Sequence, residues 1–241
     1  MKLVIAIDGP SGSGKSTVAR KVASTLGLSF LDTGAMYRAL TWWALERGVD
    51  LSDRDQIGRL ALELPLEMGT DPSNPTVSVA GHDVAAAIRE TRISEAVSAV
   101  ATNQAVRAEM RVRQRAFAEN GDVVIEGRDI TTVIAPDAPV RVLLTASENA
   151  RLARRAKELH GVADDDAVAR TRDQVVRRDA DDSTVSVFTE ASDGVTLVDS
   201  SHMSIEETIA AVLEVVARET GVVPGGGSDV PGGAGPSEWF E

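Results

Sequence analysis

The sequence predicts an α/β fold, in which a parallel five-stranded sheet is covered by helices on both faces and carries a small antiparallel insert. Short apolar runs alternate with segments of helical periodicity, which is typical of parallel strands joined by helices. The apolar run at 3–7 leads into the Gly-rich stretch GPSGSGKST at 9–17, which indicates a turn from a buried strand into a helix. Prolines and glycines punctuate residues 60–80, and residues 76–79 alternate as antiparallel strands do.

The individual elements follow from periodicity and from residues that begin or end helices. Strands are expected at the short apolar runs 3–7, 30–31, 123–125, 140–145 and 195–198. Helices are expected at 15–26, 35–47, most of 88–120, 147–160, 164–179 and from 204 onward. Gly27 and Gly48 end the first two helices, and Ser204 and Glu207 have the spacing of a capping box at the start of the last.

Composition excludes several classes of protein. The chain has no cysteine, which rules out disulfides, thiolate metal sites and a cysteine nucleophile. Its net charge of -12 argues against general binding to a nucleic-acid backbone. It has neither a signal-peptide pattern nor an apolar run of membrane-spanning length. We therefore expect a cytoplasmic protein that has no nucleic-acid or membrane partner.

The last 21 residues differ in composition from the rest of the chain. Seven of the residues at 221–241 are glycine and three are proline, so this segment cannot bury enough apolar surface to offset its chain entropy. We expect a disordered tail there. Trp239 and Phe240 near its end leave open a short interaction motif or a terminus without a role.

The stretch at 9–17 matches the P-loop pattern in full, with a strand before it and a helix after it. Glycines allow consecutive backbone N–H groups to surround phosphate oxygens, and the following helix adds its positive N-terminal end. Lys15 can reach the β- and γ-phosphates of ATP, and the Ser16 hydroxyl can bind Mg²⁺. The residues expected around the nucleotide are Gly9, Pro10, Ser11, Gly12, Ser13, Gly14, Lys15, Ser16 and Thr17.

A P-loop alone leaves two classes open, a small-substrate kinase and a nucleotide-operated switch. A guanine-specific switch needs an Asn-Lys-x-Asp segment, and none of the four asparagines is followed by lysine. Residues 55–58 (DQIG) resemble a switch Asp-x-x-Gly, but they are expected to lie in an insert and not at the end of a strand. These observations favour a kinase.

Several further segments have the order and spacing of one family. They are LDTGAMYR at 31–38, QRAF at 114–117, EGRD at 126–129, PDAPV at 136–140 and RRDADDS at 177–183. Together with the P-loop and the insert, they resemble the bacterial cytidylate kinases, P-loop nucleoside monophosphate kinases that phosphorylate CMP and dCMP. The resemblance runs from about residue 3 to 217 and leaves out only the tail.

The resemblance implies an organisation and a reaction. It implies a kinase domain over 1–220, with a CMP-binding insert at about 60–100 and a lid at about 147–180. It implies transfer of the ATP γ-phosphate to CMP and dCMP in pyrimidine nucleotide salvage, by a monomer. The remaining alternative is another P-loop kinase that acts on a small substrate.

The same resemblance implies roles for named residues. Catalytic roles fall to Lys15, Arg38, Arg128 and Arg155, the last within a lid cluster that includes Arg151 and Arg154. The substrate site would consist of Thr33, Tyr37, Arg38, Ser98, Arg107, Arg128, Asp129, Arg178 and Asp182. In this set Arg38 and Arg128 would hold the acceptor phosphate, whereas Arg178 and Asp182 would bind the ribose.

The base pocket implied by the resemblance is chemically consistent. Cytosine presents an N4 amino donor, which Asp129 would accept, and Ser98 and Arg107 would complete the pocket. Uracil has a carbonyl at that position and would leave the buried carboxylate unpaired, which is an effective way to reject a substrate.

Two other positions near this site are informative. Glu126 ends the third strand, where a carboxylate can hold a water molecule on Mg²⁺. Val185 stands where the family usually has an arginine, and no Pro-Leu pair follows it. Either a nearby arginine, with Arg177 as a candidate, replaces the missing contact or acceptor binding is weaker.

Overall fold

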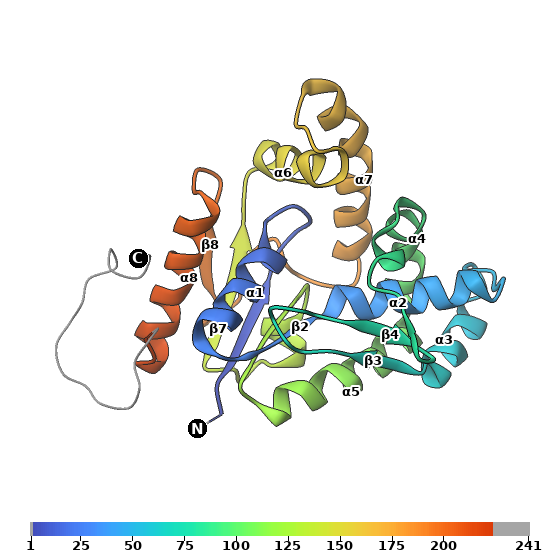
Figure 1. Cartoon of the computed structure of the whole chain (residues 1–241), viewed down its shortest axis with the longest axis horizontal. Coiled ribbons are helices and arrows are strands. Elements are labelled where there is room, and N and C mark those ends of the chain that lie inside the picture. Colours follow the sequence, from blue (N-terminus) through green and yellow to red (C-terminus); the bar gives the residue numbers. More distant parts are fainter. Residues whose placement is uncertain (1, 224–241) are drawn as a thin grey trace.

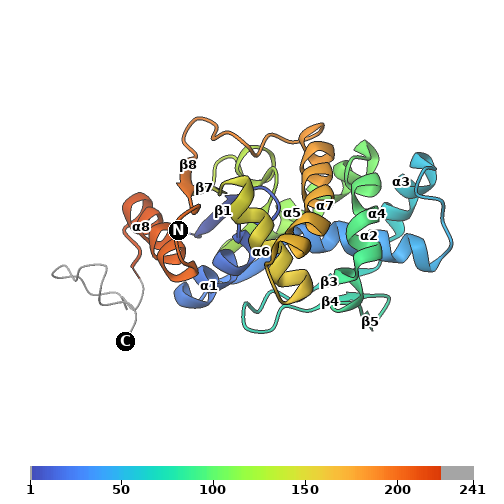
Figure 2. The ribbon, with the colours of Figure 1, turned by 90° about the horizontal axis from the view of Figure 1, so that it is seen from above.

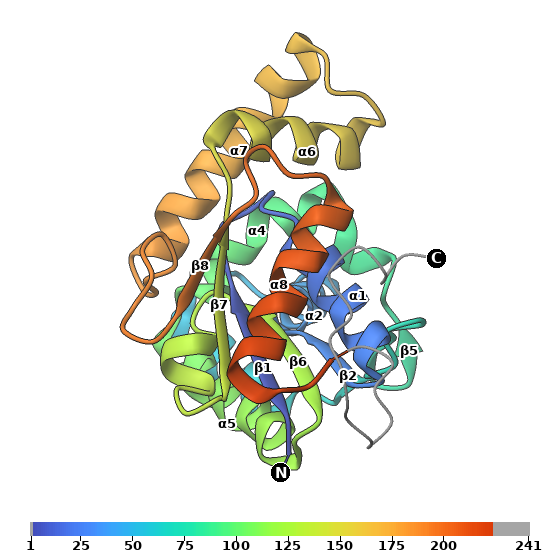
Figure 3. The same cartoon turned by 90° about the vertical axis from the view of Figure 1, so that its left-hand side faces the viewer.

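The computed structural model describes residues 2–223, without the side chains at 158–160, 170, 173 and 174. Its central sheet consists of β1 (Val4–Asp8), β2 (Ser29–Asp32), β6 (Val123–Gly127), β7 (Val140–Thr145) and β8 (Thr196–Asp199). The strands are all parallel and lie in the order β2-β6-β1-β7-β8 (Figures 1 and 3). This confirms the predicted parallel sheet of five strands.

The register of the sheet brings the ends of its central strands together. Val4 pairs with Val123, and Asp8 at the end of β1 pairs with Gly127 at the end of β6. All five residues of β6 are buried, as are the last four of β1, which is typical of parallel strands covered on both faces. The residues that follow β1 and β6 therefore meet at the carboxyl edge, where open α/β sheets bind ligands.

Helices cover both faces of the sheet. One face packs against α1 (Lys15–Leu26) and α8 (Ile205–Thr220), with Val22 and Val212 in the shared core (Figure 3). The other face packs against α2 (Thr33–Glu46) and α5 (Gln104–Asn120), with Leu40 and Met110 in a second core. Ser204 and Glu207 form the predicted capping box at the start of α8.

The antiparallel insert is a small three-stranded sheet of β3 (Leu66–Met68), β4 (Val77–Val79) and β5 (His82–Asp83). A helix that the sequence analysis missed, α3 (Arg54–Glu63), precedes it, with Asp53 as its N-cap. Residues 55–58 lie within this helix and not at a strand end. A short 3₁₀ turn, η1 (Ala87–Arg89), and α4 (Thr91–Ala101) follow the insert.

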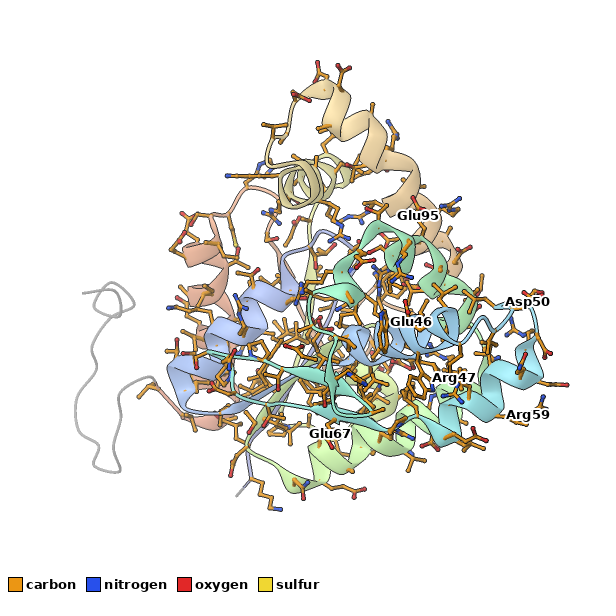
Figure 4. The ribbon with its side chains drawn as sticks, turned by 45° about the vertical axis from the view of Figure 1, so that its right-hand side comes forward. Glu46, Arg47, Asp50, Arg59, Glu67 and Glu95 are labelled. Carbon is orange, nitrogen blue, oxygen red and sulfur yellow. The ribbon has the colours of Figure 1, made fainter. Side chains whose placement is uncertain are left out.

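Charged side chains surround the far end of α2. Figure 4 shows Glu46, Arg47 and Asp50 where α2 ends, and Arg59 on the neighbouring α3. The Arg47 guanidinium lies 4.6 Å from the ring centroid of Trp43, so this tryptophan packs under a charge. These charges lie at the end of α2 that is farther from α1.

The paired helices α6 (Glu148–His160) and α7 (Asp165–Ser183) stand above the carboxyl edge of the sheet (Figures 1 and 2). A π-helical turn, η2 (Ile130–Ile134), follows β6 and begins beside Asp8 at the end of β1. Helix α7 extends four residues beyond its predicted end, since Ser183 is its last residue. Nearly all of the predicted tail, including Trp239 and Phe240, lies outside the described residues.

Candidate active site

A cleft of about 550 Å³ opens at the carboxyl edge of the sheet. It is bounded by the loop after β1, the start of α2, the insert, α4, the end of β6, α6 and α7. Predicted site residues that line it are Ser11, Gly12, Gly14, Lys15, Ser16, Thr17, Thr33, Tyr37, Arg38, Arg107, Arg128, Asp129, Arg155, Arg178 and Asp182. The predicted residues Gly9, Pro10, Ser13 and Ser98 do not line it.

The Gly-rich loop at 9–17 joins β1 to α1. Gly12 and Gly14 have left-handed backbones, with φ of 75° and 87°, which glycine adopts most readily. Lys15 bonds the carbonyl of Pro10 at 3.2 Å. Burial and, to a lesser extent, the charge of Arg128 lower the pKa of Lys15 to about 8, although the charge of Glu126 opposes this shift. An anion in this loop would therefore meet a desolvated cation.

Ser16 and Glu126 link the loop to the end of β6. The Ser16 hydroxyl donates to Glu126 Oε1 at 2.5 Å. Burial and, to a lesser extent, the neighbouring charge of Asp32 raise the pKa of Glu126 to about 7. Within residues 2–223, no cluster of three or more acidic or histidine side chains could hold a metal by itself. A hydroxyl and one carboxylate nevertheless suit Mg²⁺, which usually takes few protein ligands beside phosphates and water.

Arg38 is held in place by the residue that begins its helix. Its Nη2 lies 2.8 Å from Asp32 Oδ2, while Asp32 Oδ1 accepts from the Ala35 amide and caps α2. Burial alone would raise the pKa of Asp32, but the charge of Arg38 and these hydrogen bonds lower it overall. The pair thus fixes an arginine at the wall of the cleft.

Arg128 follows β6 and is surrounded by acceptors. Its Nη1 donates to the Gly9 carbonyl at 3.2 Å, and its Nη2 lies 3.0 Å from both Asp179 Oδ1 and Asp182 Oδ2. The guanidinium also lies 4.3 Å from the ring centroid of Phe188. These contacts leave Arg128 few alternative orientations.

A buried ion pair lies deeper in the cleft. Arg107 Nη2 is 2.6 Å from Asp129 Oδ2 and 3.0 Å from Ser186 Oγ. Both partners are nearly buried, with side-chain exposures of 5% and 9%. Burial raises the pKa of Asp129, although the charges of Arg107 and Arg111 oppose this. The Asp129 carboxyl group is therefore almost buried, and Arg107 fixes its orientation.

The predicted Ser98 is not part of this wall. Helix α4 instead presents Ser94, Val97 and Ala101 to the cleft. Ser98 lies on the same helix, one turn after Ser94, and its carbonyl accepts from the Thr102 hydroxyl at 2.8 Å. The role assigned to Ser98 remains a prediction.

A buried carboxylate supports the turn that carries Asp129. Asp8, at the end of β1, accepts from the amides of Ile130 and Thr131 at 2.9 and 2.8 Å, and from the Thr131 hydroxyl at 2.7 Å. Burial raises the pKa of Asp8 to about 6 despite these hydrogen bonds. Asp8 thus connects the strand before the Gly-rich loop to the turn after β6.

Two neighbouring arginines on α7 differ in position. Arg178 lines the cleft, and its Nε lies 3.8 Å from Asp182 Oδ2. Burial and, to a lesser extent, the charge of Arg128 lower the pKa of Arg178 to about 10. Arg177 is exposed and does not line the cleft. The structure therefore gives no support to the suggestion that Arg177 replaces the arginine missing at Val185, which remains a prediction.

The three arginines of α6 also differ in what they contact. Arg155 lines the cleft. Arg154 donates to the Ser200 carbonyl and hydroxyl at 2.6 and 2.9 Å, and Arg151 donates to the Ser11 carbonyl at 2.9 Å. Two of the three thus anchor α6 to the body of the protein, and Arg155 faces the cleft.

Sequence reasoning missed several residues that surround this site. No role was assigned to three aspartates, although each makes a hydrogen bond that supports the cleft. Asp8 and Asp179 accept from backbone amides, and Asp32 accepts from Arg38. Asp32 carried a usable signal, because it directly follows a strand and stands six residues before Arg38. The contacts of Asp179 span distant parts of the chain and had no such signal.

Comparisons with known proteins agree with the geometry. The family model for cytidylate kinase matches residues 5–218. Cytidylate kinase from Cutibacterium acnes is 49% identical over 89% of this chain and 96% of its own length. Cytidylate kinase from Streptomyces avermitilis is 46% identical over 90% of this chain and 94% of its own.

A solved structure has a weaker likeness. The shikimate kinase from Acinetobacter baumannii in complex with shikimate is aligned over 91% of this chain and 96% of its own, at 15% identity and a TM-score of 0.39. The family match covers nearly all of the described residues, and the chain belongs to the cytidylate kinase family.

Proposed function

We propose that this chain transfers the γ-phosphoryl group of ATP to the phosphate of CMP, and of dCMP, at the carboxyl edge of its sheet. The single observation that carries this proposal is that Lys15, Arg128 and Asp129 line one cleft. A donor phosphate, an acceptor phosphate and a base each require a different chemistry, and the cleft offers all three.

The donor would lie along the Gly-rich loop. Backbone amides of this loop and the N-terminus of α1 suit the phosphates of ATP, and the buried Lys15 ammonium suits its β- and γ-oxygens. When bound, Mg²⁺ neutralises charge on the phosphates. Ser16 would hold it directly, and Glu126, which accepts from Ser16, would hold its water.

The acceptor phosphate would lie between Arg38 and Arg128. Planar guanidinium groups bind phosphate oxygens in pairs, and both arginines are held by carboxylates that fix their orientation. An oxygen of the CMP phosphate attacks the γ-phosphorus, and the bond from that phosphorus to the β,γ-bridging oxygen breaks, which yields CDP and ADP. The attacking oxygen is already anionic, so no strong general base is needed.

Catalysis in this scheme consists of positioning and charge neutralisation. Arg155 would approach the transferring group from α6, on the lid side of the cleft. Exclusion of water from a closed site keeps water from replacing CMP as the acceptor.

Base selection would depend on Asp129. Its carboxylate is oriented by Arg107 at 2.6 Å and can accept from the N4 amino group of cytosine. The thymine and uracil O4 atom is an acceptor, so it would leave this buried carboxylate unpaired.

An assay of nucleoside monophosphates tests the proposal. The purified chain is incubated with ATP, Mg²⁺ and either CMP, dCMP, UMP, AMP or GMP, and each diphosphate product is quantified by chromatography. We expect CDP and dCDP to form with the highest kcat/KM. Equal or faster turnover of AMP or GMP would contradict the assignment. Omission of Mg²⁺ with added chelator is expected to abolish transfer.

A further inference from the structure

One carboxylate on α7 joins three separate parts of the cleft. Asp179 Oδ1 accepts from the Ser11 amide of the Gly-rich loop at 3.0 Å and lies 3.0 Å from Arg128 Nη2. Its other oxygen, Oδ2, bonds Arg151 Nη1 on α6. The side chain is only 13% exposed, so these contacts are made largely out of water.

Arg151 completes this arrangement on the lid side. The same Nη1 that bonds Asp179 donates to the Ser11 carbonyl at 2.9 Å. Asp179 and Arg151 therefore hold the amide and the carbonyl of one loop residue. The backbones of the loop and α6 are also in contact, because a Cβ atom at Gly12 would clash with the carbonyl oxygen of Arg151.

The nearby Asp182 makes a different set of contacts. Its carboxylate lies 3.0 Å from Arg128 and 3.8 Å from Arg178, both at the acceptor side of the cleft. Asp179 contacts the same Arg128 and, in addition, contacts the Gly-rich loop and α6. A movement of α6 away from the loop would therefore break contacts on the carboxylate that also orients Arg128.

We propose that Asp179 is a positioning residue that couples the seating of the lid helix α6 on the Gly-rich loop to the orientation of Arg128. This rests on the proposed function, in which Arg128 binds the acceptor phosphate. In this arrangement the donor loop, the lid and the acceptor arginine take their working positions together. Transfer is fast only when the reacting atoms are aligned, so loss of this coupling lowers kcat more than it weakens nucleotide binding.

The first variant is Asp179→Asn, which keeps the shape and one acceptor but removes the charge shared by Arg128 and Arg151. We expect a loss of about 10- to 100-fold in kcat, as for removal of a charge-assisted hydrogen bond, with KM for ATP within about threefold. We also expect more ADP per CDP, because an unseated lid admits water as the acceptor. The ratio of ADP to CDP distinguishes a positioning defect, which raises this ratio, from a general loss of folded enzyme, which does not.

The second variant is Arg151→Met, and the third combines it with Asp179→Asn. Because both residues act through one contact, the double variant is expected to lose little more kcat than Asp179→Asn alone. Glu148→Gln is the matched control, since it breaks the exposed α6–α7 ion pair between Glu148 and Arg172, which are 2.9 Å apart. It is expected to stay within about twofold of wild type.

Wild-type kcat and ADP-to-CDP ratio in Asp179→Asn would overturn the proposal, as would additive losses in the double variant. Should Asp179→Asn fail to fold by circular dichroism, Arg151→Met decides alone: a lowered kcat with excess ADP supports coupling, and wild-type values refute it. The unmodified chain is assayed in the same series. Its failure to form CDP would contradict the proposed function and not the coupling.

Discussion

The Arg107 guanidinium lies 2.6 Å from the Asp129 carboxylate, and the pair is almost completely buried in the cleft. A buried carboxylate is costly unless it is paired, and here one oxygen is paired with Arg107. A ligand that donates a hydrogen bond to Asp129 gives the carboxylate a further partner, whereas a ligand that presents a carbonyl oxygen to it does not. This relationship is the physical basis for the proposed preference for cytosine.

Replacement of Asp129 tests that basis. Asp129→Ala is expected to leave ATP binding intact and to lower the ratio of kcat/KM for CMP over UMP by about 10- to 100-fold. The measurement is steady-state kinetics with each monophosphate, together with ATP titration by calorimetry. Asp137→Ala, at an exposed position after the same turn, is the control and should keep the wild-type ratio. An unchanged ratio in Asp129→Ala would rule out this base pocket.

Lys15 is expected to give the reaction an alkaline limit. Lys15→Ala should abolish CDP formation, because the buried ammonium has no substitute at the end of the Gly-rich loop. The pKa of Lys15 in the free protein is about 8, lowered by burial and by Arg128. As the pH rises through 8 the ammonium loses its proton, so kcat/KM for ATP is expected to fall by up to about tenfold per pH unit.

The matched variant is Lys15→Arg, whose guanidinium stays charged over this range. It is expected to be slow but to lack the decline above pH 8. A wild-type profile that is flat to pH 10 would contradict the assigned role of Lys15, as would the same decline in Lys15→Arg.

Asp8 is expected to make stability depend on pH in a direction unusual for a carboxylate. Burial raises its pKa from 3.8 to about 6, so between these values the folded chain keeps a proton that the unfolded chain has lost. The stability from Asp8 is thus complete below pH 4 and is lost as the pH rises through 6. Urea unfolding of wild type and Asp8→Asn should show that wild-type stability minus variant stability decreases from pH 4 to 7. A difference that increases over this range would refute the shift.

Gly12 and Gly161 provide a comparison at the same φ angle. Both have φ of 75°, but a Cβ atom at Gly161 meets open space and one at Gly12 meets the Arg151 carbonyl. Gly161→Ala is expected to lose about 1 kcal/mol of unfolding free energy, and Gly12→Ala about 1–3 kcal/mol more, with lower kcat. Equal losses measured by urea unfolding would show that the loop and α6 are not in close contact.

Local sequence signals predicted most of the fold because each acts within a few residues. The apolar runs at 3–7 and 123–125 and the Gly-rich turn between strand and helix are such signals. Helix α3 was missed because prolines and glycines just after it dominated the interpretation of that stretch. The end of α7 was placed too early for a similar reason, since an acidic run at 179–182 resembles a solvated turn.

The site was predictable where a residue type at a fixed spacing carries the chemistry, as in the Gly-rich loop and at Asp129. It was not predictable where the function of a residue lies in contacts across the chain. Asp179 and Ser11 are 168 positions apart, and Asp8 and Thr131 are 123 apart. No pattern within a short window can relate residues so distant, and only the folded backbone brings them together.

The central claim is that donor and acceptor phosphates meet in one cleft between Lys15 and Arg128. Its most direct test is inhibition by an adenosine and a cytidine joined 5′ to 5′ through an oligophosphate that spans both subsites. The account predicts that this compound competes with ATP and with CMP, and binds far more tightly than either nucleotide alone. Competition with only one of the two substrates, at the affinity of a single nucleotide, would contradict it.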